Sequence, residues 1–187
     1  AILKAIEETP GAFVRCTSEF PYYPAMQKLI SIVREGKLGK ILSVRAGFCH
    51  SSDMDLTKPI NWKRMIAFNG EYGCMGDLGM HACHIPFRAG WTPKNVRAIL
   101  SNLVPERPDG KGMMAQCETW DNATLLCEAI NPIDGNSFPW AVKTQRIAPG
   151  EKDSWYMEVL GMKKCAKYSS KNTNSIRIMD YTAGKDQ

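Results

Sequence analysis

The sequence predicts an α+β domain in which a large, mostly antiparallel, open β-sheet carries helices on one face. Two observations lead to this prediction. Helix-like patterns lie in the first half of the 187-residue chain, whereas the second half holds strand-like runs with no helix between them. Turn signals rich in Pro, Gly and Asn separate those runs. Strands that follow one another without crossover helices are typical of antiparallel sheets.

The first half is predicted to alternate helices with short strands. The expected elements are a helix end at 1–9, a strand at 13–16, a helix at 25–35, a strand at 41–50 and, after glycines at every third position from 70 to 79, a helix that runs to about 89. Pro24 suits the first turn of the helix at 25–35 and Gly36 its end. Its apolar stripe comprises Ala25, Leu29, Ile30 and Val33, and one face of the following strand comprises Leu42, Val44, Ala46 and Phe48.

The second half is predicted to consist of six strands. They lie at 96–104, 122–130, 138–147, 154–160, 164–169 and 175–181. An open sheet with helices on one face leaves its other face uncovered. Alternation within two of these strands indicates as exposed positions Trp140, Val142, Trp155 and Met157. Large exposed apolar patches usually mark interfaces, so we expect a homo-oligomer that buries this face.

Composition excludes several classes of protein. A net charge of +5 is spread along the chain instead of being concentrated in one element, which argues against a nucleic-acid-binding protein. No stretch approaches the length of apolar residues needed to span a membrane. The seven cysteines are odd in number and form no C-x-x-C pair, which favours reduced thiols in a cytoplasmic protein.

The segment from Gly73 to His84 contains the clearest group of candidate catalytic side chains. Asp77, His81 and His84 are spaced by four and three residues, so they share one helix face. A carboxylate beside an imidazole can fix its tautomer and raise its basicity, which is equipment for general acid–base catalysis. Packing of a glycine-rich helix start explains the same residues equally well. They could also bind a metal ion, but a fourth ligand would have to come from elsewhere.

A second glycine pattern has no such support. Residues 110–115 match G-x-G-x-x-A, the dinucleotide-binding pattern. That pattern binds pyrophosphate only between a strand and the N-terminus of a helix. Here two prolines precede it and strand-like sequence follows it, so we predict a loop.

Several motifs together resemble one family of enzymes. The helix that opens after Tyr22-Tyr23-Pro24 ends in Gly36-Lys-Leu-Gly39-Lys, and Trp62 and Asp77-x-Gly79-x-His81 follow. Further on comes Val159-Leu-Gly161-Met-Lys, among strands. In this order they resemble the C-terminal domain of the Gfo/Idh/MocA oxidoreductases, NAD(P)-dependent dehydrogenases of sugars and inositols.

The resemblance implies roles for individual residues. His81 would be the catalytic acid–base group, and Asp77 would orient it or hold a neighbouring hydroxyl. Tyr22, Tyr23, Trp62 and Lys63 would contribute to substrate binding. His84 stands where many members carry an aspartate, and we expect it at the floor of the pocket without a bound metal.

The resemblance also implies an organisation. Residues 1–20 would be the end of a Rossmann domain and its linker, and residues 21–187 a substrate-binding and oligomerisation domain, truncated at its C-terminus. NAD or NADP would be bound by the missing N-terminal domain, so this fragment alone would be inactive. Its partners would be a sugar or polyol and further copies of itself, as a homodimer or homotetramer paired through the sheet.

Overall fold

Helix α2 (Pro24–Arg34) forms where the sequence predicts it. Pro24 occupies the first helical position, and the chain leaves the helix at Gly36, whose φ is 65°. The buried residues of α2 are Ala25, Met26, Leu29, Ile32 and Val33. The predicted stripe is therefore correct except for Ile30, which packs against its margin.

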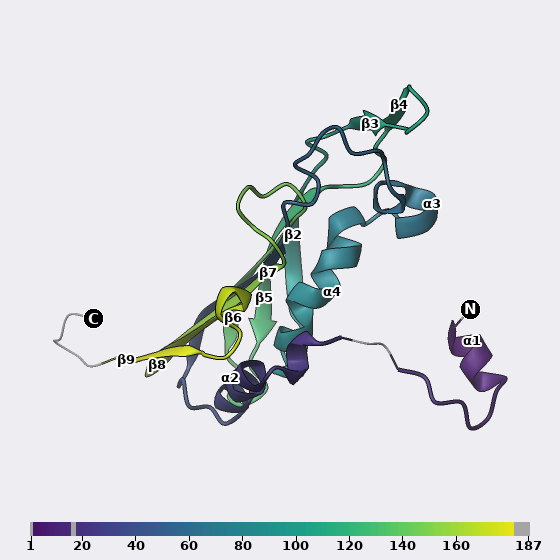
Figure 1. Ribbon diagram of the computed structural model, residues 1–187. Coiled ribbons are helices and arrows are strands. Elements are labelled where there is room, and N and C mark those ends of the chain that lie inside the picture. Colours follow the sequence, from purple (N-terminus) through teal and green to yellow (C-terminus); the bar gives the residue numbers. More distant parts are fainter. Residues whose placement is uncertain (1, 16–17, 182–187) are drawn as a thin grey trace.

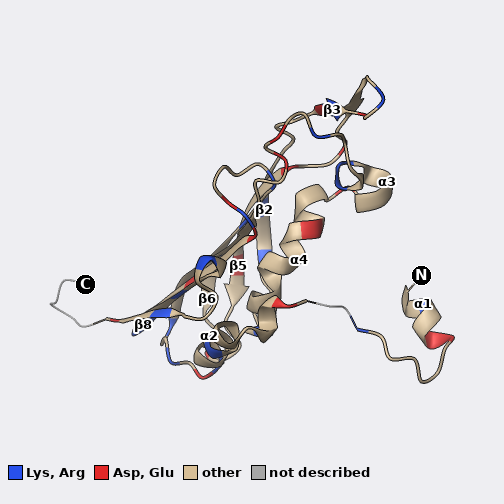
Figure 2. Cartoon of the chain, viewed as in Figure 1, with Lys and Arg blue, Asp and Glu red and all other residues tan. Residues whose placement is uncertain are grey.

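The computed structural model describes residues 2–15 and 18–181 (Figure 1). The remaining helices are α1 (Ile2–Glu7), α3 (Ile66–Asn69) and α4 (Gly73–Arg88), with short 3₁₀ turns at Phe20–Tyr22, Trp62–Arg64 and Ser170–Asn172. None of the helices in this described part is long and apolar enough to cross a membrane. Lys and Arg are interspersed with Asp and Glu over the loops and strands (Figure 2).

A seven-stranded sheet forms the body of the protein, in the order β2-β5-β6-β1-β7-β8-β9. The strands are β1 (Ile41–Cys49), β2 (Pro93–Ser101), β5 (Asn122–Ile130), β6 (Ser137–Gln145), β7 (Ser154–Gly161), β8 (Lys164–Ser169) and β9 (Arg177–Asp180). Neighbours are antiparallel except β1 and β6, which are parallel. This confirms the predicted fold class. A separate hairpin, β3 (Glu106–Pro108) and β4 (Met114–Gln116), lies far from α2 at the other end of the elongated molecule (Figure 1).

Helices α4 and α2 cover one face of the sheet. Helix α4 packs on β6 and β1, and α2 reaches β8. The core between them contains Trp140, Val142, Trp155 and Met157, each at most 2% exposed. The prediction that these four residues are exposed was therefore wrong. Alternation along a strand separates two faces but does not say which one the helices cover.

Two smaller predictions for the first half also fail. A register irregularity between Ile41 and Ser43 turns Leu42 outward, so Ile41 is buried in its place. Residues 13–15 form no strand, and Phe13 is 83% exposed. The fourth residue of that predicted strand, Cys16, lies outside the described residues.

Candidate functional site

Helix α4 begins against the backbone of another loop, and this contact places its polar face. Gly73 has a φ of 51°, and a Cβ atom added there would lie 2.5 Å from the carbonyl oxygen of Trp120. The Cys74 amide donates to the same carbonyl at 3.0 Å. Only glycine allows so close an approach in this backbone conformation. The first turn of α4 is thereby fixed, and Asp77 projects from the next.

Asp77 lies between two cations. Arg146, the residue that follows β6, donates to its carboxylate, and the Lys63 ammonium lies 3.3 Å from the same oxygen. The Arg146 side chain is 3% exposed and that of Asp77 is 22% exposed, so the carboxylate retains access to solvent. Charge-assisted hydrogen bonds of this kind hold a side chain in one orientation.

His81 lies one turn further along α4. Its ring packs edge-on against Phe20 and Phe48, with centroids 5.6 and 5.3 Å away, and its carbonyl accepts from the Trp155 indole at 2.8 Å. Asp77 and His81 share the helix face predicted by their spacing. The carboxylate is directed to Arg146 and Lys63, and no hydrogen bond joins it to His81 among the described residues.

A third histidine, His50, belongs to the same cluster. It follows β1, and the parallel pairing of β1 with β6 brings it beside Arg146 at the common end of the two strands. Its Nδ1 lies 3.1 Å from Asp153. Burial lowers the pKa of His50, Asp153 and Asp77 oppose the change, and the charges of Arg146 and Lys63 add to it.

Sequence reasoning missed both His50 and Arg146. Each stands at the end of a strand that the sequence predicted, directly after the last paired residue. A polar residue at a strand end is a weak signal by itself. The parallel pairing of two strands far apart in the sequence makes them neighbours, and no local pattern shows that pairing.

His84 lies at the other end of this helix face. Its Nδ1 is 2.8 Å from the Ser18 hydroxyl, and the Arg88 guanidinium donates to its Nε2 at 3.2 Å. Because a guanidinium can only donate, we assign the proton to Nδ1 and a neutral ring. Burial lowers the pKa of His84, and the charge of Arg88 adds to the shift.

The remaining predicted binding residues divide between the two ends of α4. Trp62 is half exposed beside Asp77's partner Lys63, whose ammonium lies 5.5 Å from the indole centroid. Tyr22 instead stacks with Arg88, roughly 16 Å along the helix from Asp77. Tyr23 packs against Phe20. The structure therefore groups Trp62 and Lys63 with Asp77, places Tyr22 beside Arg88, and places Tyr23 against Phe20, whose ring also packs on His81.

Several of the atoms that would have to bind a metal ion already have other partners. Asp77 is paired with two cations, and both ring nitrogens of His84 have partners. In the described ranges 2–15 and 18–181, no group of three His, Cys, Asp or Glu side chains is arranged to hold a metal ion. The arrangement is suited to binding hydroxyl groups and moving a proton.

The same fold occurs in NAD-binding oxidoreductases. An oxidoreductase domain protein from Kribbella flavida superposes with a TM-score of 0.77 at 24% identity, covering 89% of this chain and 42% of that one. A levoglucosan dehydrogenase solved with NADH and L-sorbose superposes with a TM-score of 0.76 at 20% identity, covering 90% of this chain and 43% of the other.

Sequence comparison identifies the family. Residues 26–164 match the GFO/IDH/MocA C-terminal domain, and the chain belongs to this family. Glucose-6-phosphate 3-dehydrogenase of Bacillus subtilis is 23% identical over 96% of this chain and 49% of its own length. Levoglucosan dehydrogenase of Pseudarthrobacter phenanthrenivorans is 29% identical over 46% of this chain and 22% of its own. The chain thus spans half or less of these relatives.

Proposed function

We propose that this chain is the substrate-binding and catalytic half of an NAD(P)-dependent oxidoreductase that acts on a CH–OH group of a sugar, inositol or related polyol. The observation that carries the proposal is a solvent-accessible carboxylate, Asp77, held by Lys63 and Arg146 one helical turn from His81. Family membership supports it, as do the names of two relatives, both dehydrogenases of sugar compounds.

Oxidation of an alcohol removes a hydride from carbon and a proton from oxygen. His81 would accept the hydroxyl proton, because a neutral imidazole is a suitable base near neutral pH. Asp77 would accept a hydrogen bond from a neighbouring hydroxyl, and Lys63 would donate one. His50 lies close enough to Asp77 for the two side chains to interact electrostatically, and it would face the same substrate.

A nicotinamide would supply the hydride acceptor. The described residues do not fit its pyrophosphate, because residues 110–113 lie in the turn between β3 and β4, residues 114–115 belong to β4, and the segment opens no helix. We therefore assign cofactor binding to a separate Rossmann domain. In this arrangement residues 1–20 belong to the end of that domain and its linker, and residues 21–187 form the substrate domain.

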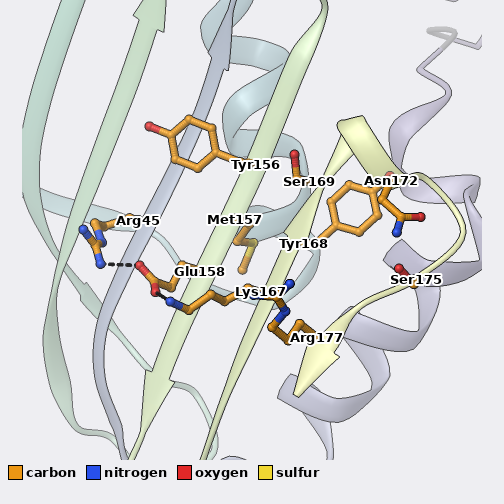
Figure 3. A pocket seen from close by; sticks show the side chains of 10 residues that line it. All are labelled: Arg45, Tyr156, Met157, Glu158, Lys167, Tyr168, Ser169, Asn172, Ser175 and Arg177. Carbon is orange, nitrogen blue, oxygen red and sulfur yellow. Dashed lines mark ion pairs between the residues drawn. The ribbon is translucent and has the colours of Figure 1, made fainter. Parts of the chain in front are cut away.

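We also propose that the uncovered face of the sheet pairs with a second copy of the chain. This face carries a hollow of about 470 Å³ in which Glu158 binds both Arg45 and Lys167 (Figure 3). A second hollow of about 390 Å³ is lined mainly by apolar side chains, among them Leu42, Leu160 and Met179. A monodisperse monomer by light scattering at high concentration would contradict this pairing.

Six cysteines in the described part are free, and five of them are buried. Burial raises the pKa of Cys74 to about 11 and that of Cys83 to about 12. Unpaired, buried thiols are characteristic of a reducing compartment, so we assign the protein to the cytoplasm.

The function is tested with the full-length natural polypeptide and a panel of sugars, sugar phosphates and inositols. Reduction of NAD or NADP at 340 nm should depend on one of these compounds. In parallel, saturation-transfer NMR on the 187-residue chain should detect the same compound, and Lys63→Met should weaken the signal. Sugar binding without any reduction would instead indicate a non-catalytic binding domain.

A further inference from the structure

The segment Cys117–Asp121 joins β4 to β5 and contacts the elements that carry Asp77, Lys63 and Arg146, here called the Asp77 cluster. The Thr119 hydroxyl donates to the Lys63 carbonyl at 2.8 Å. The carbonyl of Asp121 accepts from the Arg146 amide at 2.9 Å. One short segment therefore contacts the backbone of both cations that hold Asp77.

The same segment also fixes the helix that carries Asp77. The Trp120 carbonyl accepts from the Cys74 amide, and its backbone leaves no room for a side chain at Gly73. Glu118 accepts from the Ile66 amide at 2.8 Å, which anchors the start of α3. Displacement of this segment would move α4, Lys63 and Arg146 relative to one another.

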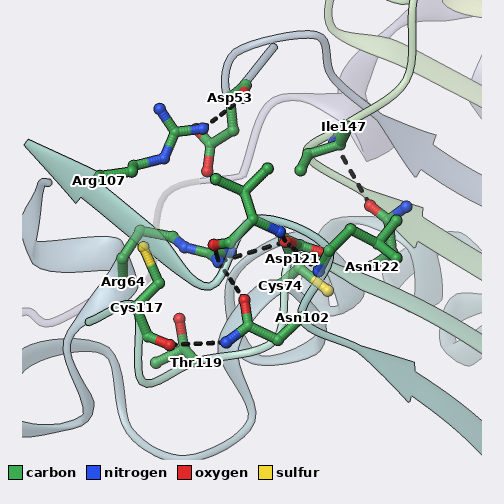
Figure 4. Close-up of polar contacts among 12 residues, drawn as sticks. Asp53, Arg64, Cys74, Asn102, Arg107, Cys117, Thr119, Asp121, Asn122 and Ile147 are labelled. Carbon is green, nitrogen blue, oxygen red and sulfur yellow. Dashed lines mark hydrogen bonds and ion pairs between the residues drawn. The ribbon is translucent and has the colours of Figure 1, made fainter. Parts of the chain in front are cut away.

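A buried ion pair anchors the segment. The Asp121 carboxylate and the Arg64 guanidinium lie 3.3 Å apart, and both side chains are 0% exposed (Figure 4). The same carboxylate oxygen accepts from the Leu103 and Val104 amides at 2.8 and 2.9 Å. Arg64 is the chain neighbour of Lys63, so the pair connects the Lys63 side of the cluster to the Arg146 side.

We propose that Asp121 is a positioning residue: through Arg64 and its own carbonyl it sets where Lys63 and Arg146 meet Asp77. Stabilisation alone does not explain this ion pair, because several of its buried polar atoms make no hydrogen bond. Arg64 Nε and Nη1 and Asp121 Oδ1 are buried and have no hydrogen-bond partner among the described residues. Buried ion pairs often contribute less to stability than apolar replacements would. We therefore attribute the Arg64–Asp121 pair to the positioning of Lys63 and Arg146.

His50 provides a reporter for the proposal. The charged groups with the largest effects on its pKa are Asp153, Arg146, Lys63 and Asp77. Loss of the Asp121 charge alone could only lower the pKa of His50, because a carboxylate favours the imidazolium form. Displacement of Lys63 and Arg146 would raise it. The direction of the change therefore separates lost charge from lost position.

The experiment is an NMR titration of the 187-residue chain, which has three histidines that His→Gln variants assign. Lys63→Met and Arg146→Met calibrate the reporter, since each should raise the pKa of His50. Asp121→Asn preserves the size of the side chain and should raise it as well. His84, whose pKa is lowered mainly by burial and by the charge of Arg88, is the internal control and should not change.

An unchanged or lower His50 pKa in Asp121→Asn would overturn the proposal, and so would a parallel change at His84, which would indicate general loosening. If Asp121→Asn does not fold, Thr119→Val takes its place. This substitution removes the hydrogen bond from the Thr119 hydroxyl to the Lys63 carbonyl. It must raise the pKa of His50 and leave that of His84 unchanged. This inference rests on the proposed function, which makes the Asp77 cluster a substrate site. The titration requires no enzymatic activity, so the positioning role of Asp121 and the proposed function can fail independently.

Discussion

The two faces of the sheet are built from the same strands and differ in almost everything else. Toward the helices, β1, β6 and β7 present Val44, Trp140 and Trp155, each at most 1% exposed. Toward the other side, β1 and β7 present Arg45 and Glu158, which are ion-paired. The apolar face is a buried core, whereas the open face combines ion pairs with exposed apolar side chains, some of which line the second hollow. Stability and the orientation of the site should therefore depend on the first face and association on the second.

The largest expected effect is on the covered face. Trp140→Ala should lower the free energy of unfolding by about 3–5 kcal/mol, because it leaves a cavity in a core that cannot collapse around it. Its control is Leu126→Ala in the neighbouring strand β5, where the side chain is 57% exposed. That variant should change stability by about 0.5 kcal/mol or less. Urea unfolding measures both, and equal losses would abolish the distinction between the faces.

The second prediction compares two ion pairs. Asp121→Asn should cost about 3 kcal/mol, because Arg64 remains charged and buried without its partner. Glu158→Gln on the open face should cost about 1 kcal/mol or less, since its partners Arg45 and Lys167 are largely solvated. The comparison requires chemical denaturation of both variants at one pH. A larger loss for Glu158→Gln would contradict it.

Sequence alone predicts which helix residues face the sheet, but it does not predict which face of the sheet those helices cover. Ala25, Leu29 and Val33 form an apolar stripe on one side of a helix, and such a stripe is buried against the core. Trp140 and Trp155 were assigned to the wrong face because alternation is symmetric: both faces of a strand repeat every second residue. Which face the helices cover depends on tertiary contacts that strand periodicity does not contain.

The site divides in the same way. Asp77 and His81 could be identified because their spacing on one helix is a local property. Arg146, His50 and Asp121 could not, because they join the cluster through the pairing of β1 with β6 and through the loop after β4. The placement of Tyr22 beside Arg88 likewise follows from the path of the chain before α2.

The third prediction concerns pH. The pKa of His50 is lowered by burial and by the charges of Arg146 and Lys63, although Asp153 opposes the change; burial and Arg88 lower the pKa of His84. The unfolded state then binds more protons than the folded state as the pH falls below about 6.5. Their contribution is complete above that pH and is lost as the pH falls toward the folded-state values.

Thermal unfolding between pH 7.5 and 5.5 measures this loss. The melting temperature should decrease across the interval, and His50→Gln should flatten the dependence. A melting temperature that rises as the pH falls would contradict a lowered pKa of both histidines in the folded state.

The smallest effect on stability is expected for a substitution that disturbs only the association of two copies. Leu126→Glu places a charge on the open face and should leave the unfolding free energy nearly unchanged, because the side chain is already exposed in a single copy. If this face pairs with a second copy, the variant should shift the protein toward monomers in sedimentation experiments. Dissociation by Met80→Glu on α4 instead, with Leu126→Glu still associated, would move the interface to the helical side.

The most direct measurement is the kcat of the full-length polypeptide on its best sugar or polyol substrate. His81→Ala should reduce kcat about 10²–10⁴-fold with little change in cofactor affinity, because proton removal accompanies hydride loss at one carbon–oxygen unit. Asp77→Asn should reduce it less, and the two losses should not add. Lys164→Gln, which removes a surface ion pair with Asp180, is the control and should retain normal kcat. Near-normal kcat in both His81→Ala and Asp77→Asn would contradict the account and return these residues to helix packing.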